Sequence, residues 1–181
     1  DEENWARVID EVTSTLGNIS ILVNNAGVGE RSDFRHLSDE AWDRVWAVNL
    51  DGTVRCAREA FALLKASGKA SVINLSSIMA TKHTRQMSVY SATKGAVKMF
   101  TQGLSREVGG RGITVNNVQP GPIDTELNPA AGDWAAPQKA ATALNRYGSV
   151  DDVAALVAFV AGPESSYITG ANLTVDGGMN A

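Results

Sequence analysis

Cysteine, basic charge and long apolar runs are all scarce in this chain, and each scarcity excludes a class of protein. The 181 residues include one cysteine, Cys56, so no disulfide can form within the chain, and we expect a cytoplasmic location. Sixteen basic residues against 20 acidic ones give a net charge of −4, which leaves no basic surface for nucleic acid. The longest apolar run, residues 153–161, is much shorter than the ~20 residues of a membrane span. We therefore expect neither a nucleic-acid partner nor a membrane partner.

The first residues of the chain already follow a helical pattern, with no methionine and no signal peptide before them. Apolar residues recur there at spacings of three and four: Trp5, Val8, Ile9, Val12 and Leu16. A chain that starts inside a helix is expected to be a segment of a longer protein. The length and the absence of any linker predict a single domain, residues 1–181.

Apolar periodicity predicts strands that alternate with helices along the rest of the chain. We expect strands at 19–24, 71–75, 113–118 and 172–175, and helices at about 40–65, 88–108, 135–144 and 150–160. Asn49 and Gly52 weaken the first of these helices, and Asn49 indicates either a kink or a buried, hydrogen-bonded amide. Alternating strands and helices form βαβ units, so the fold class is predicted to be α/β, with a doubly wound parallel sheet of the Rossmann type.

Small and polar residues follow three of the predicted strands. The first strand ends in Asn24-Asn-Ala-Gly27, the second in Ser76-Ser77, and residues 119–125 follow the third. Each stretch alone is more typical of an ordinary turn. Ligands of open α/β sheets bind outside the carboxyl ends of the strands, however, so three such ends at one edge predict a binding crevice.

Tyr90 and Lys94 are four residues apart in the expected helix 88–108, so their side chains share one face. An ammonium beside a phenol favours the phenolate, which predicts a pKa for Tyr90 below ~10 and proton exchange near neutral pH. Ser77 can donate a hydrogen bond to a substrate oxygen as negative charge develops there. By itself the Tyr/Lys pair is a weak signal, because such helical pairs are more often surface contacts.

In combination, these stretches resemble the short-chain dehydrogenase/reductase family, and most of all its 3-oxoacyl-carrier-protein reductase-like members. The resemblance covers essentially the whole chain in family order: Asn24-Asn-Ala-Gly27, Val48-Asn-Leu50, Asn74-Leu-Ser-Ser77, Tyr90-Ser-Ala-Thr-Lys94, Pro120-Gly-Pro-Ile-Asp-Thr125, Ile168-Thr-Gly170 and Val175-Asp-Gly-Gly178. It implies an oxidoreductase that uses NADP or NAD, with NADP the first choice, to interconvert a ketone and a secondary alcohol. It also implies a small-molecule carbonyl or alcohol substrate and a homodimer or homotetramer.

The resemblance further implies roles for individual residues. The catalytic residues would be Asn49, Ser77, Tyr90 and Lys94, with Tyr90 as general acid in ketone reduction and general base in alcohol oxidation. Lys94 would also bind the nicotinamide ribose, and Asn49 would hold the water of a proton relay. The cofactor-binding residues would be Tyr90, Lys94, Asn25, Ala26, Gly27, Pro120, Gly121, Ile123 and Thr125. No metal site is expected, since His36 and His83 are isolated from other metal-ligating side chains.

The chain departs from the family pattern in its glycine-rich segment. No G-x-G-x-x-G or T-G-x-x-x-G-x-G spacing occurs, so the turn that cradles the pyrophosphate and the first three family strands are absent from this chain. We expect the remainder to come from a natural precursor, and strand 19–24 to present an open apolar edge. Two alternatives to an enzyme stay open: a ligand-binding protein on the same scaffold, such as a cyclic-dinucleotide-binding mediator of biofilm dispersal, and a structural remnant.

Overall fold

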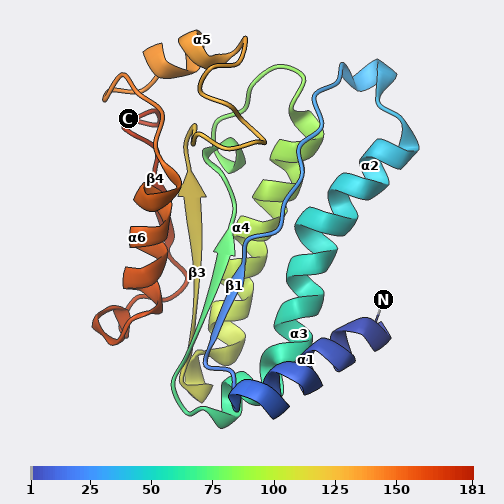
Figure 1. Ribbon diagram of the computed structural model, residues 1–181, viewed down its shortest axis with the longest axis vertical. Helices are drawn as coiled ribbons and strands as arrows, with labels where there is room; N and C mark the ends of the chain where they lie inside the picture. Colours follow the sequence, from blue (N-terminus) through green and yellow to red (C-terminus); the bar gives the residue numbers. More distant parts are fainter. Residues whose placement is uncertain (1) are drawn as a thin grey trace.

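Four parallel strands form the centre of the molecule, and the computed structural model describes residues 2–181. The strands are β1 (Ile21–Asn24), β2 (Ala70–Leu75), β3 (Ile113–Pro120) and β4 (Asn172–Val175), side by side in the order β1-β2-β3-β4 (Figure 1). Every neighbouring pair is parallel. The predicted parallel α/β sheet is therefore confirmed, although β1 begins two residues later than expected and β3 extends to Pro120.

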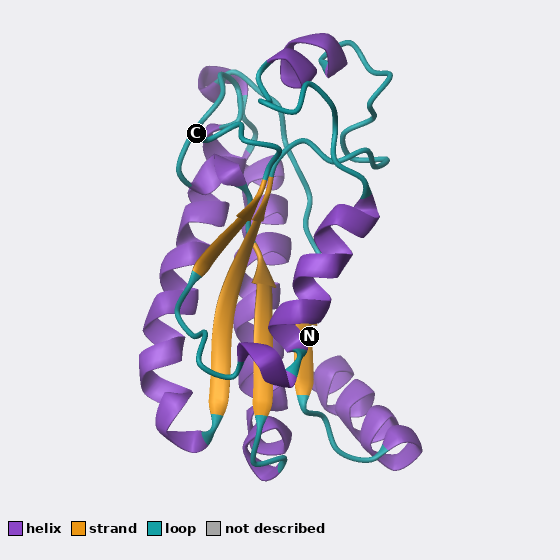
Figure 2. Cartoon of the chain, turned by 90° about the vertical axis from the view of Figure 1, so that its left-hand side faces the viewer, coloured by secondary structure: helices purple, strands orange, loops and turns teal. Residues whose placement is uncertain are grey.

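Within the described residues, six α-helices connect and cover these strands (Figure 2): α1 (Glu2–Leu16), α2 (Asp39–Trp46), α3 (Gly52–Ala66), α4 (Ser88–Val108), α5 (Ala135–Ala140) and α6 (Val150–Ala161). The helix predicted at 40–65 is confirmed, since α2, a π-helical segment η2 (Ala47–Asp51) and α3 follow one another without a break, and the π-helical turns include Asn49, one of the two predicted weak positions. The helix predicted at 135–144 ends at Ala140, since turns follow and Asn145 adopts a left-handed φ of 55°. No helix within residues 2–181 has the length and apolar character needed to cross a membrane.

The two faces of the sheet carry separate hydrophobic clusters, because successive side chains of a strand point to opposite faces. On one face Val72 and Val115 pack with Leu64 of α3 and Val108 of α4. On the other face, Ile73, Leu75 and Val118 pack with Val160 of α6. At the edge of the sheet, Ile21 and Val23 of β1 remain 47% and 42% exposed, in agreement with the open apolar edge expected there.

A row of asparagines crosses the sheet on the α4 side, in register from strand to strand: Asn24, Asn74, Asn117 and Asn172. Asn24 Nδ2 donates to Asn74 Oδ1 at 2.8 Å, and Asn117 Nδ2 donates to Asn172 Oδ1 at 2.8 Å. Asn74 Nδ2 donates to Thr101 Oγ1 of α4 at 2.9 Å. These side chains fix the register of the strands and the position of α4 relative to β2.

Candidate active site

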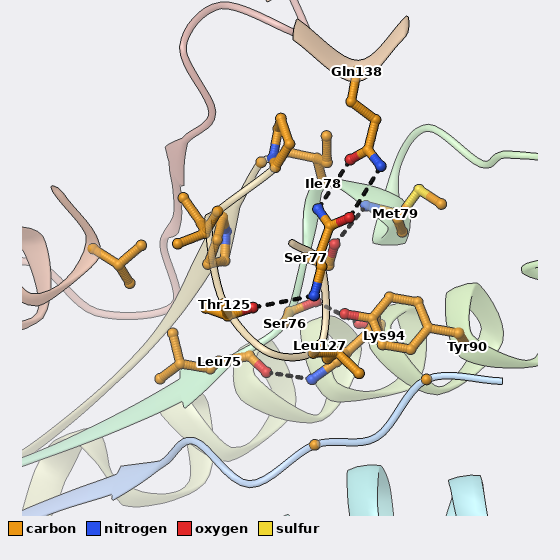
Figure 3. A pocket seen from close by; sticks show the side chains of 18 of the residues that line it. Leu75, Ser76, Ser77, Ile78, Met79, Tyr90, Lys94, Thr125, Leu127 and Gln138 are labelled. Atoms are coloured by element: carbon orange, nitrogen blue, oxygen red, sulfur yellow. Dashed lines mark hydrogen bonds between the residues drawn. The ribbon is translucent and has the colours of Figure 1, made fainter. Parts of the chain in front are cut away.

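A cleft of about 790 Å³ lies at the carboxyl ends of β1, β2 and β3, the place predicted from the sequence (Figure 3). Its walls come from the segments that follow these strands, from α4 and from the region around α5. Nine of the expected site residues line it: Asn25, Gly27, Ser77, Tyr90, Lys94, Pro120, Gly121, Ile123 and Thr125. Asn49 and Ala26, the other two, are not among the lining residues.

Lys94 is held at the base of the cleft by the end of β2. Its side chain extends from α4, and Nζ donates to the carbonyl oxygen of Leu75 at 2.8 Å (Figure 3). Ser76 Oγ donates to the carbonyl oxygen of Lys94, also at 2.8 Å, so the last residue of β2 and the residue after it contact Lys94 at its side chain and its backbone. Only 4% of Lys94 is exposed, and burial lowers the pKa of its ammonium from 10.5 to about 8.

Tyr90 lies one helical turn before Lys94, but the predicted lowering of its pKa is wrong. Burial of the phenol raises the pKa of Tyr90, and a side-chain hydrogen bond with Ser77 offsets this effect only in part. Lys94 Nζ is 5.6 Å from the ring centroid of Tyr90 and donates its hydrogen bond to Leu75 instead. The sequence indicates that the two residues share a face, but it does not reveal where the ammonium points or how deeply the phenol is buried.

Asn49 lies behind the cleft wall, in the π-helical segment η2, and is 1% exposed. Its Oδ1 accepts from the backbone N of Val28 at 2.8 Å, and its Nδ2 donates to the carbonyl oxygen of Val28 at 3.0 Å. The same Nδ2 donates to Thr93 Oγ1 of α4 at 3.0 Å. The amide is therefore buried and hydrogen-bonded, and it joins the loop after β1 to the helix that contains Tyr90 and Lys94.

Two glycines allow close approach of the backbone at this site. A Cβ atom on Gly27 would lie 3.2 Å from Lys94 Nζ, so glycine keeps the space beside the ammonium open. A Cβ atom on Gly121 would lie 2.7 Å from Cα of Asp176, so glycine lets the loop after β3 pass against the chain after β4. The space beside Lys94 and the remaining N–H donors of its ammonium fit the ribose hydroxyls of a nucleotide.

The outer part of the cleft is covered by contacts that the sequence did not reveal. Asn128 and Gln138 form two reciprocal amide hydrogen bonds, of 3.0 and 3.1 Å, which join the loop after β3 to α5. In addition, the guanidinium carbon of Arg31 lies 3.8 Å from the ring centroid of Trp134. Both pairs line the cleft. The Arg31–Trp134 pair joins residues about 100 positions apart, and no local sequence signal identifies it.

Within residues 2–181, no group of three or more histidine, cysteine, aspartate or glutamate side chains is arranged to hold a metal ion. The ionisable groups that line the cleft are those of Glu30, Arg31, Tyr90, Lys94 and Asp133. Glu30 is paired with Arg44 at 3.2 Å. Of these groups, Tyr90 and Lys94 both come from α4, and burial raises the pKa of Tyr90 and lowers that of Lys94.

Comparison with known proteins relates this arrangement to reductases and dehydrogenases. The profile of a protein family described as "Enoyl-(Acyl carrier protein) reductase" matches residues 1–180. The chain is 38% identical over 182 residues to the cyclic-di-GMP-binding biofilm dispersal mediator protein of Escherichia coli K12, covering 100% of this chain and 76% of that protein. It is 34% identical over 181 residues to the 3-oxoacyl-[acyl-carrier-protein] reductase FabG of Vibrio cholerae, covering 98% and 73%. A solved short chain dehydrogenase from Burkholderia cenocepacia in complex with NADP is 40% identical, with a TM-score of 0.94, and the match covers 100% of this chain and 74% of that one.

Proposed function

Because the chain belongs to the short-chain dehydrogenase/reductase family, we propose that it is an NAD(P)(H)-dependent oxidoreductase that interconverts a ketone and a secondary alcohol. The observation that carries this proposal is the pairing of a buried ammonium with a partly exposed phenol in the cleft. Tyr90 presents a phenol one helical turn from the Lys94 ammonium, which is 4% exposed and held by Leu75. A proton donor and a cation that line the same cleft support the proposal.

The residues proposed to hold the cofactor line the same cleft. Lys94 and Gly27 offer N–H donors and space for the ribose, and Ile123 and Thr125 are proposed to contact the nicotinamide end. When bound, NADP or NAD supplies or accepts the hydride. A solved relative at 40% identity is in complex with NADP, which supports NADP as the first cofactor to test.

The proton chemistry follows from the burial of Tyr90. Because burial raises the pKa of Tyr90, the phenol keeps its proton at neutral pH and can donate it to the ketone oxygen as hydride reaches the carbonyl carbon. The ketone thus gains one hydride and one proton and becomes an alcohol. Ser77 lies on the same wall, where its hydroxyl can orient the substrate oxygen. Oxidation needs the phenolate, which burial disfavours, so reduction is the direction to test first at neutral pH.

Asn49 is proposed to act as a positioning residue, because its side chain is engaged by Val28 and Thr93. A 3-oxoacyl or other small ketone is the proposed substrate, supported by the name of the Vibrio cholerae relative. We also propose a homodimer or homotetramer in the cytoplasm. Exposed apolar side chains on two helices support self-association: Met99 of α4 is 63% exposed and Phe159 of α6 is 48% exposed.

The test is turnover of a panel of ketones by the full-length protein with NADPH, compared with its Tyr90→Phe variant. We expect Tyr90→Phe to lower kcat at least ~100-fold, since it removes the general acid, and to leave NADPH binding nearly unchanged. Tyr167→Phe is the matched control, because Tyr167 is fully exposed and does not line the cleft. Unchanged turnover by Tyr90→Phe would refute the assignment of Tyr90.

A second candidate function is binding of a cyclic dinucleotide without turnover. It is favoured by the 38% identity to the Escherichia coli protein whose name describes cyclic-di-GMP binding. Calorimetric titration of the full-length protein with cyclic-di-GMP, alongside the ketone panel, separates the two. Binding of cyclic-di-GMP together with no turnover of any ketone would favour the second function over the first.

A further inference from the structure

We propose that Gly148 is a positioning residue for cofactor binding, because it sets the place of Ile123 in the loop that follows β3. This inference rests on the proposed function, in which Ile123 contacts the nicotinamide end of the cofactor. Gly148 itself lies outside the lining of the large cleft, whereas Ile123 lies in it. Gly148 therefore acts through another residue.

The backbone of Gly148 pairs with the loop after β3 as a short parallel strand would. Ile123 and Gly148 form an isolated parallel bridge. Gly148 N donates to the carbonyl oxygen of Pro122 at 2.9 Å, and Asp124 N donates to the carbonyl oxygen of Gly148 at 3.0 Å. The residues on both sides of Ile123 are thus hydrogen-bonded to the backbone of Gly148. These bonds fix the position of the Ile123 backbone beside the cleft.

The side chain of Ile123 occupies the space that a larger residue at 148 would need. A Cβ atom on Gly148 would lie 2.6 Å from Cδ1 of Ile123, closer than carbon atoms approach without moving. Cδ1 is the free end of a flexible side chain, so the side chain moves rather than the backbone. Gly148 is not among the glycines with a positive φ, so its backbone conformation accepts alanine. Alanine at 148 should therefore displace Ile123 at little cost in stability.

Hydrogen bonds of the neighbouring residues also anchor the segment around Gly148 to the start of α6. Arg146 Nη1 donates to the carbonyl oxygen of Tyr147 at 2.8 Å and to Asp152 Oδ2 at 3.0 Å. Ser149 and Asp152 form a capping box at the start of α6. Hydrogen bonds from Arg146 and Ser149 lower the pKa of Asp152 to about 2, so this anchor persists through the neutral range.

The test is fluorescence titration of the full-length protein with NADPH, for wild type and Gly148→Ala. We expect Gly148→Ala to raise the Kd for NADPH about fivefold, since a displaced side chain changes a close contact, with a midpoint of thermal unfolding within a few degrees of wild type. In the free protein, the δ1-methyl NMR signal of Ile123 should shift. Gly110→Ala is the matched control, because a Cβ atom there meets nothing within 4 Å.

A double-mutant cycle supplies the decisive comparison. Ile123→Val removes the Cδ1 atom that the new methyl group would meet. Adding Gly148→Ala to Ile123→Val should therefore change the Kd much less than adding it to wild type. Equal effects in both backgrounds, or a Gly148→Ala variant that binds NADPH as tightly as wild type, would overturn the inference alone. A wild-type protein that binds no NADPH would instead overturn the proposed function and this inference with it.

Discussion

Lys94 imposes a pH dependence on stability that can be calculated from its burial. The pKa of its ammonium falls from 10.5 to about 8 on folding. Between these values the unfolded chain keeps the proton that the folded protein has lost, so the free energy of unfolding rises with pH there. At about 1.36 kcal/mol per pH unit, the rise due to this one group is roughly 3 kcal/mol. Below pH 8 both states are protonated, and the folded protein bears the full cost of burying the ammonium.

The perturbation that isolates this effect is Lys94→Met, which keeps most of the side-chain volume and removes the charge. Urea denaturation of wild type and variant at intervals from pH 6.5 to 10.5 gives the difference in free energy of unfolding. We expect this difference to be constant below pH 8 and to move by roughly 3 kcal/mol in favour of wild type by pH 10.5. Lys98→Met, on the same helix but partly exposed, is the matched control for loss of a lysine side chain from α4. A difference for Lys94→Met that stays flat across this range would refute the reasoning.

Two further predictions concern the contacts behind and across the cleft. Asn49→Ala should lower the free energy of unfolding by about 3 kcal/mol, because it removes three hydrogen bonds of a buried side chain. Thr93→Val removes one of these three and the bond from Thr93 Oγ1 to the carbonyl oxygen of Tyr90, so it should cost about 2 kcal/mol in urea denaturation. Equal losses would contradict this ranking. Arg31→Ala and Trp134→Ala should each raise kcat/KM for bulky ketones relative to small ones, because either change removes a large side chain from the lining of the cleft. Both substitutions break the same contact between Arg31 and Trp134. The effect of the double variant on the free energy from kcat/KM should therefore fall short of the sum of the two single effects by about 1 kcal/mol. Fully additive effects would refute this contact.

The strands and most of the helices were predictable because their signals are local. Apolar runs bounded by glycine predicted β2 and β3, and the spacing of apolar residues predicted α4 and α6. The π-helical form of the segment between α2 and α3 was not predictable. The π-helical segment there depends on Asn49 bonding to Val28 and Thr93, which are 21 and 44 residues away. The sequence marked Asn49 as a weak position in the helix, but the π-helical conformation there depends on contacts with residues far away in the sequence.

The location of the site was also predictable, whereas its electrostatics were not. Three strand ends at one edge of a parallel sheet determine where a crevice forms, and nine expected residues line it. The direction of the pKa change at Tyr90 depends on two quantities that spacing does not contain. These are the burial of the phenol and the direction of the Lys94 ammonium, which reaches Leu75 instead. A shared helical face is therefore weak evidence for a shared charge effect.

The asparagine row explains how such a site keeps its geometry. Asn74 and Asn117 are completely buried where apolar side chains would avoid the cost of desolvating an amide, and Asn117 Oδ1 has no hydrogen-bond partner among the described residues. Their hydrogen bonds fix the register of neighbouring strands. A shift of one residue between strands would turn every side chain of a strand to the opposite face of the sheet. Asn74 binds both Asn24 of β1 and Thr101 of α4, so it fixes β2 relative to the helix of Tyr90 and Lys94. The distance from Leu75 to Lys94 therefore depends on polar contacts deep in the core as well as on the residues that line the cleft.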